Sequence, residues 1–139
     1  MQIVGAQFTS EGTAAAIRLQ LGFVPDYVEY IENANGTNPN RRFWVNRDQF
    51  ASIAAGADDS ILETGSSGVN TLDTASIAVY NGGDIVTAAD VTAGLYRDRQ
   101  GNAATAGQRS QAGITIPAGD QTNSGVNFVL AIKFLAPRV

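Results

Sequence analysis

The sequence contains no cysteine and no histidine, and Lys133 is its single lysine. Without cysteine the chain has neither disulfides nor thiolate chemistry, so its redox compartment cannot be read from it. Without histidine it lacks the commonest general base, the usual zinc ligand and the third member of most nucleophilic triads. These absences argue against most enzymes that depend on a metal or an activated nucleophile.

Long apolar runs and clustered charge are also missing. No stretch approaches the ~20 continuous apolar residues that span a bilayer, and Met1 to Gly5 lack the basic head and apolar block of a signal peptide. The net charge of -4 is spread thinly, with no run of like charge longer than Asp58-Asp59 or Arg41-Arg42. Nucleic acids and anionic membranes both attract clustered basic surfaces. We therefore expect neither as a partner.

Short segments separated by turn residues make up the chain. Its 139 residues fit one domain, residues 1–139, and an apolar content of 44% is normal for a globular protein. The recurrence of Gly, Asn, Asp, Ser and Thr is the rhythm of a sandwich or barrel. We predict an all-β, jelly-roll-like antiparallel β-sandwich with at most one or two short helices. Its N-terminal segment, residues 1–10, is expected to be flexible or ordered by a partner.

The clearest predicted strand lies at the C-terminus, where apolar residues recur at every second position. The face that we expect to be the core face comprises Val126, Phe128, Leu130, Ile132 and Phe134. A short apolar stretch, residues 113–117, precedes it across the polar loop 118–125. This order predicts an antiparallel pair joined by a long hairpin loop.

A second pair is predicted near the N-terminus. Residues 17–21 alternate between apolar and polar, a Gly-Phe-Val-Pro turn follows, and residues 27–32 are rich in β-branched and aromatic side chains. Residues 33–40 have the composition of a loop. Residues 41–47 read as the next strand, with Phe43 and Val45 on one side and Trp44 on the other.

The middle of the chain carries weaker signals. A short helix is expected from Asp48 to Gly56, and strands are expected over residues 60–64 and 76–80. Residues 87–90 match a helix capping box, but Gly94 weakens a helix there, and a strand over residues 85–87 is an equally good prediction. Residues 98–111 are almost free of apolar side chains, which predicts a long exposed loop or an arm ordered by a partner.

Carboxylates are the main candidates for chemistry, because a glycosidase needs only two acids. The candidates are Asp58, Asp59, Glu63, Asp84, Asp90 and Asp120. Most stand beside Gly, Asn or Ser, as solvated turn and cap carboxylates do. Calcium binding by Asp58 and Asp59 or around Asp84 lacks the ligand spacing of an EF-hand. A phosphate-binding loop and a dinucleotide fingerprint are absent. We therefore predict no catalytic residue, no metal and no cofactor.

Aromatic and basic side chains are the candidates for contacts between subunits. Tyrosine and tryptophan are enriched at interface hot spots, although burial in the domain's own core accounts equally well for each aromatic. The candidate contact residues are Tyr27, Tyr30, Trp44, Tyr96, Arg97 and Arg99. Residues 41–44 mix arginine with aromatics as single-strand binders do, but a strand with stacked arginines is the simpler interpretation.

Two segments resemble small structural proteins of the tailed-bacteriophage virion. Leu21 to Asn33, with its Gly-Phe-x-Pro turn and Val28 three residues after the proline, is similar to their opening segment. The stretch Gly-Ile-Thr-Ile-Pro at 113–117 and the strand that begins Gly-Val-Asn-Phe at 125–128 are similar to their ending. The typical aromatic-x-Ala-x-Arg ending is matched only loosely by Phe128, Ala131 and Arg138.

This resemblance implies a virion component without catalytic residues. The first expectation is a capsid decoration (cement) protein, assembled in the host cytoplasm and located on the capsid surface. Its partners would be the major capsid protein and copies of itself, as a trimer or a dimer. The alternative is a tail or fibre component with a receptor- or glycan-binding role. A small glycan hydrolase is the third candidate.

Overall fold

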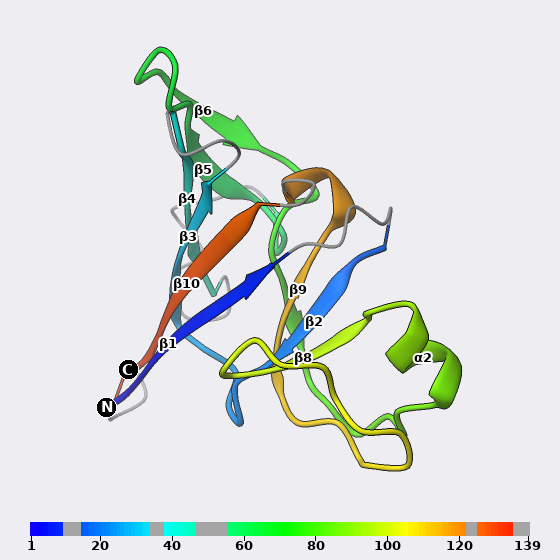
Figure 1. The fold of residues 1–139 in the computed structure, drawn as a ribbon. Coiled ribbons are helices and arrows are strands. Elements are labelled where there is room, and N and C mark those ends of the chain that lie inside the picture. Colours follow the sequence, from blue (N-terminus) through cyan, green and yellow to red (C-terminus); the bar gives the residue numbers. More distant parts are fainter. Residues whose placement is uncertain (10–14, 34–37, 47–55, 122–124, 135–139) are drawn as a thin grey trace.

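The structure is a computed structural model that describes residues 1–9, 15–33, 38–46, 56–121 and 125–134. It is a two-sheet β-sandwich (Figure 1), which confirms the predicted fold class. The larger sheet has the order β1 (Gln2–Thr9), β10 (Val126–Lys133), β3 (Tyr27–Asn33), β4 (Asn40–Val45), β5 (Ser60–Glu63) and β6 (Asn70–Asp73). The smaller sheet has the order β7 (Ala78–Tyr80), β9 (Gly113–Ile116), β2 (Ile17–Gln20) and β8 (Tyr96–Asp98). Neighbouring strands are antiparallel except for β2 and β8, which are parallel.

The core lies between the two sheets and is filled mainly by large side chains. Trp44 and Tyr30 from the larger sheet meet Leu19 and Ile114 from the smaller one, and all four are fully buried. Trp44 donates its indole N–H to the Ala57 carbonyl at 3.1 Å, which satisfies the one polar atom that this residue brings into the core. As predicted, Trp44 points to the opposite side of β4 from Phe43 and Val45.

The face of β10 that enters the core is the reverse of the predicted one. Val129 and Ala131 are fully buried, whereas the side chain of Phe128 is 39% exposed. Small inward side chains on β10 leave room for the rings of Tyr30 and Trp44 on the neighbouring strands at normal packing density. Asn127 is buried too, and it accepts a hydrogen bond from the Tyr30 hydroxyl at 2.8 Å.

The two predicted hairpins are also wrong, because their strands belong to different sheets. β9 pairs with β2 and β7, while β10 pairs with β1 and β3. Likewise, the turn at Gly22–Pro25 leads the chain from one sheet to the other. The apolar faces of β2 and β3 both point into the core, so they oppose each other across the sandwich instead of lying side by side.

Residues 2–9 form the edge strand β1 in place of the flexible segment expected there. Their pairing with β10 runs from Gln2 opposite Lys133 to Thr9 opposite Val126. The free ends of β1 and β10 therefore lie together at one corner of the molecule (Figure 1).

Residues 81–95 and 99–112 cover part of the outer side of the smaller sheet. Tyr80 and Tyr96 pack with Val86 in a second, small core. The predicted capping box is confirmed: Thr87 and Asp90 cap the five-residue helix α2 (Ala88–Thr92), and a 3-10 turn, η1 (Ala118–Asp120), lies elsewhere in the chain. Residues 99–109 are largely exposed, as expected of a long loop. The predicted helix 48–56 falls almost wholly outside the described residues.

Candidate functional site

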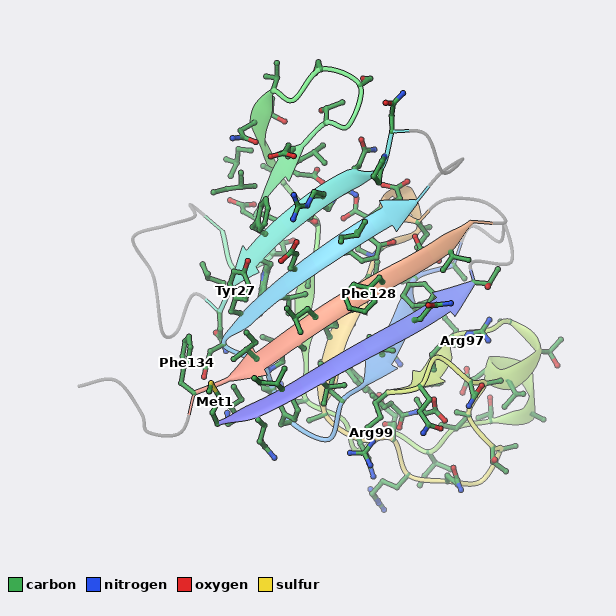
Figure 2. The ribbon with its side chains drawn as sticks, turned by 60° about the vertical axis from the view of Figure 1, so that its left-hand side comes forward. Met1, Tyr27, Arg97, Arg99, Phe128 and Phe134 are labelled. Carbon is green, nitrogen blue, oxygen red and sulfur yellow. The ribbon has the colours of Figure 1, made fainter. Side chains whose placement is uncertain are left out.

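The outer side of the larger sheet is the main candidate site, because no described element covers it (Figure 2). The pairing between strands places every second side chain of each strand on this side. We call this surface the outer face, and its apolar members are Ile3, Tyr27, Ile31, Phe43, Val45, Ile61, Leu72, Val126, Phe128, Leu130, Ile132 and Phe134.

Large apolar side chains on the outer face are exposed to an unusual degree. Ile3 is 57% exposed, and Phe128 and Phe134 are 39% and 42% exposed. Single exposed apolar residues are normal, but a contiguous patch of several hundred Å² marks an interaction site. The strand lengths and the usual spacing of ~4.8 Å between strands and ~3.3 Å per residue give the outer face an area of roughly 600 Å².

Two of the three charged residues of the outer face form an ion pair, and the third, Glu63, lies opposite Arg41 on β5. The Arg41 Nη2 donates to the Glu29 Oε1 at 2.6 Å, and the Arg41 guanidinium lies 5.6 Å from the centre of the Phe43 ring. The hydrogen bond to Glu29 and the charge of that carboxylate raise the pKa of Arg41. Burial, together with the neighbouring Glu29 charge, raises the pKa of the Tyr27 hydroxyl. The outer face is therefore a mainly apolar surface that carries one internal ion pair and one further carboxylate, Glu63.

A buried ionic cluster lies on the inner side of the same sheet. Arg42 donates to Glu32 and to Asp73, each at 2.8 Å, and lies 3.3 Å from Asp120. Burial would lower the pKa of Arg42, but the hydrogen bonds to Asp73 and Glu32 raise it. Burial raises the pKa of Asp120, while a hydrogen bond from Ser76 opposes that rise. The four charges tie together strands and turns that are distant in the sequence.

The candidate carboxylates are dispersed, and most have a local role. Asp59 accepts from the Gly56 backbone at 2.6 Å, Asp84 from the Tyr80 hydroxyl at 2.7 Å, and Asp90 from the Thr87 backbone at 2.8 Å. Asp120 belongs to the buried ionic cluster, and Glu63 lies opposite Arg41 on the outer face. Over the described residues, no group of three acids could hold a metal ion.

The six predicted contact residues separate into two groups. Tyr30, Trp44, Tyr96 and Arg97 are buried within the chain, so for these aromatics the core role holds. Tyr96 serves the second core, where its ring and that of Tyr80 lie within about 5 Å of the Arg18 guanidinium. Tyr27 lies on the outer face and Arg99 on the exposed loop, so these two remain available to a partner.

Sequence reasoning missed most of the outer face. The alternation in β10 was visible, but a period of two looks the same from both sides of a sheet. The usable signal was residue size: Asn127, Val129 and Ala131 are smaller than Phe128, Leu130 and Ile132, and the smaller set is the buried one.

A polar pocket of about 820 Å³ lies beside the smaller sheet, at the long loop. Gln20 forms part of it from β2, and Arg99, Gln108 and Arg109 contribute from the loop. Arg109 is held by a hydrogen bond of 2.9 Å to the Gly83 carbonyl. Amides and guanidinium groups of this kind can hydrogen-bond hydroxyls and carboxylates.

The chain was compared with protein families, curated proteins and solved structures, and none of the three comparisons gives a match. Within the part of the chain that the structure describes, no helix has the length and apolar character needed to cross a membrane.

Proposed function

We propose that this chain is a structural protein of a tailed-phage virion, a capsid decoration protein that stabilises the head by binding between capsid subunits. The observation that carries the proposal is the outer face. A sandwich that leaves about 600 Å² of sheet uncovered and largely apolar is completed by contact with a neighbouring subunit. The dispersed carboxylates, each tied to a cap, a turn or a buried cluster, also favour a contact role over a catalytic one.

The resemblance of the opening and closing segments to small virion proteins supports a place in a phage particle, and we assign the chain to the head in preference to the tail. The exposed loop of residues 99–109 is the element that we assign to the shell, because it projects away from the outer face and offers Arg99. Such a protein acts through many contacts of modest strength that symmetry multiplies over the shell.

Co-sedimentation of the full chain with purified phage shells, before and after expansion, tests this function. We expect saturable binding to shells of at least one form, and bound shells that withstand more heat. Arg99→Glu should weaken binding about tenfold or more, since one buried interface contact accounts for ~1.4 kcal/mol or more. Val69→Ser, at an exposed position in the β5–β6 turn, is the matched control. Absence of binding to both forms of shell would refute the proposal.

A second candidate function, a tail or fibre component that binds a glycan, is favoured by the polar pocket alone. In that case an acidic oligosaccharide titrated into the full chain should shift the amide NMR signals of the residues around Gln108 and Arg109. Gln108→Ala should weaken that binding, and Val69→Ser should not. A titration without shifts would leave the decoration role as the better assignment.

A further inference from the structure

We infer that the outer face is covered by the outer face of a second copy of this chain, about a twofold axis parallel to the strands and between β10 and β3. The inference rests on the proposed function, because it names the partner that completes the assembly subunit. It follows from the area of the outer face, the position of its charges and the match between rows of side chains.

The first argument is area. Strands β1, β10, β3 and β4 carry about 450 Å² of the outer face, so two copies that overlap on these strands cover about 900 Å². A specific interface needs about 1,000 Å², so this overlap lies close to that value and suits an association of modest strength.

The second argument is that the outer face complements itself. Rotation by half a turn about the proposed axis places β10 of one copy over β3 of the other, and β1 over β4. Residues that lie opposite each other on neighbouring strands of one copy, which we call a row, then have the same height along the axis in both copies. Phe128 then faces Ile31 of the other copy, since both belong to one row. Ile132 faces Tyr27 in the same way. Two sheets that pack in an aligned way keep their strand directions within ~30° of each other. Residue pairs close to the axis therefore stay opposite each other in the two copies.

The β1 and β4 rows match as well. Phe43 faces Gly5 of the other copy, and the Phe128 ring of that copy lies over this glycine, 3.6 Å from the position of a Cβ, so Phe43 meets an aromatic ring there. Arg41 faces the amide side chain of Gln7, which can accept a hydrogen bond from the guanidinium.

The third argument is the placement of charge. Glu63 lies on β5, outside the four overlapping strands, and so remains at the rim. Glu29 lies within the overlap, where its ion pair with Arg41 of the same chain offsets its charge. Apart from this one ion pair, the proposed interface has the apolar centre and polar rim that are usual in protein interfaces.

Sedimentation equilibrium of the full chain in solution measures the stoichiometry. We expect a species of twice the chain mass of 14.5 kDa. In the proposed dimer Phe128 faces Ile31 and Leu130 faces Glu29 of the other copy. Phe128→Ser and Leu130→Ser should each raise the dimer dissociation constant ~10-fold or more, because each removes an apolar side chain that is buried near the axis. Val69→Ser removes an apolar side chain of similar exposure away from the outer face and should leave the constant unchanged.

Cross-linking provides a test that does not depend on a loss of binding. The chain contains no cysteine, so Leu130→Cys introduces a single thiol beside the axis. Sheets packed face to face are ~10 Å apart, so a bismaleimide of about that length should join two copies. Val69→Cys should give no cross-linked dimer.

Three results would each overturn the inference. They are a monomer at all concentrations, a trimer, or a dimer that forms equally well in Phe128→Ser and Leu130→Ser and cross-links through Val69→Cys. Shell binding by such a monomer or trimer would leave the proposed function in place. A dimer that binds no shell would retain this inference and refute the virion role.

Discussion

At the residue scale, Arg42 is the side chain on which the polar part of the interior depends. Its guanidinium holds Glu32, Asp73 and Asp120 together, and the side chain is only 6% exposed. Tyr30 adds a hydrogen bond to the Asp120 carbonyl at 2.8 Å. A buried charge that loses its partner keeps the full desolvation penalty, so the members of this cluster depend on one another.

Replacement of Arg42 by methionine should lower the free energy of unfolding by about 3–5 kcal/mol, because it leaves three carboxylates without their cation. Arg41→Met, on the adjacent residue and the opposite side of β4, removes an ion pair that solvent reaches in the single chain, so it should cost much less at concentrations below the dimer dissociation constant. Urea denaturation of both variants measures the difference. Equal losses would show that the cluster is not specifically stabilising.

The raised pKa of Asp120 predicts a dependence of stability on pH. The folded state holds this proton more tightly than the unfolded state, so the Asp120 contribution to stability falls as pH rises from the ordinary pKa of 3.8 through the folded-state pKa. Asp120→Asn removes that titration, so the stability lost in this variant should shrink as pH increases from 4 to 7. Urea denaturation of the wild type and Asp120→Asn across that range measures it, and a growing loss would contradict the assignment.

At the scale of elements, the turn that follows β8 is fitted closely to the edge strand β1. Gly101 has a φ of +85°, and a Cβ added there would lie 1.6 Å from the Gln7 carbonyl oxygen. Gly107 has nearly the same φ, +86°, but a Cβ there would meet only open space. The two glycines therefore separate backbone strain from contact between the loop and the strand.

Gly107→Ala should cost only the left-handed backbone strain of about 1–2 kcal/mol. Gly101→Ala should cost a further 1–3 kcal/mol or so, because the backbone of β1 or of the turn must move. Hydrogen exchange of the Gln7 and Phe8 amides should accelerate in Gly101→Ala and not in Gly107→Ala. Equal effects in the two variants would show that the turn does not support β1.

The sequence predicted strands well where β-branched and aromatic residues are frequent, as in β3, β4 and β10. It missed β6, whose residues Asn70–Asp73 include two types that are depleted in strands. It also mistook the partners of β2 and β9, since alternation describes one strand and says nothing of the strand beside it. Pairing across more than 80 residues, as between β2 and β9, is set by the shared core.

For the candidate site, the sequence identified few of the residues. Tyr27 and Arg99 remain available at the surface, whereas Tyr30 and Trp44 are in the core. Aromatic side chains serve interfaces and cores equally well, so composition alone could not separate them. The outer face became visible only once the register assigned Phe128, Leu130 and Ile132 to one side of the sheet.

At the scale of the whole molecule, the two outer sides of the sandwich differ. Residues 81–95 and 99–112 lie over part of the smaller sheet and form a second core there, but no described element lies over the larger sheet. The two sides therefore suit different partners: an apolar one for the outer face and a polar one for the loop and its pocket.

Association through the outer face predicts that thermal stability depends on protein concentration. Binding of a second copy stabilises the folded state by mass action, so the Tm of the wild type should rise with concentration. Phe128→Ser should abolish that rise, while Val69→Ser should retain it. Differential scanning calorimetry over a hundredfold range of concentration measures both, and a Tm that does not change in the wild type would argue against self-association.

The corner where Gln2 pairs with Lys133 has a mechanical consequence. Tension applied to the outer ends of β1 and β10 would pull the two strands apart perpendicular to their axes, and the hydrogen bonds between them would break one after another, as in a zipper. Strands that are sheared along their length resist far better, because their bonds share the load. A tether at that corner would therefore be the weakest attachment of this chain, and an assembly that strains it would need to transmit the load through the broad sides of the sandwich.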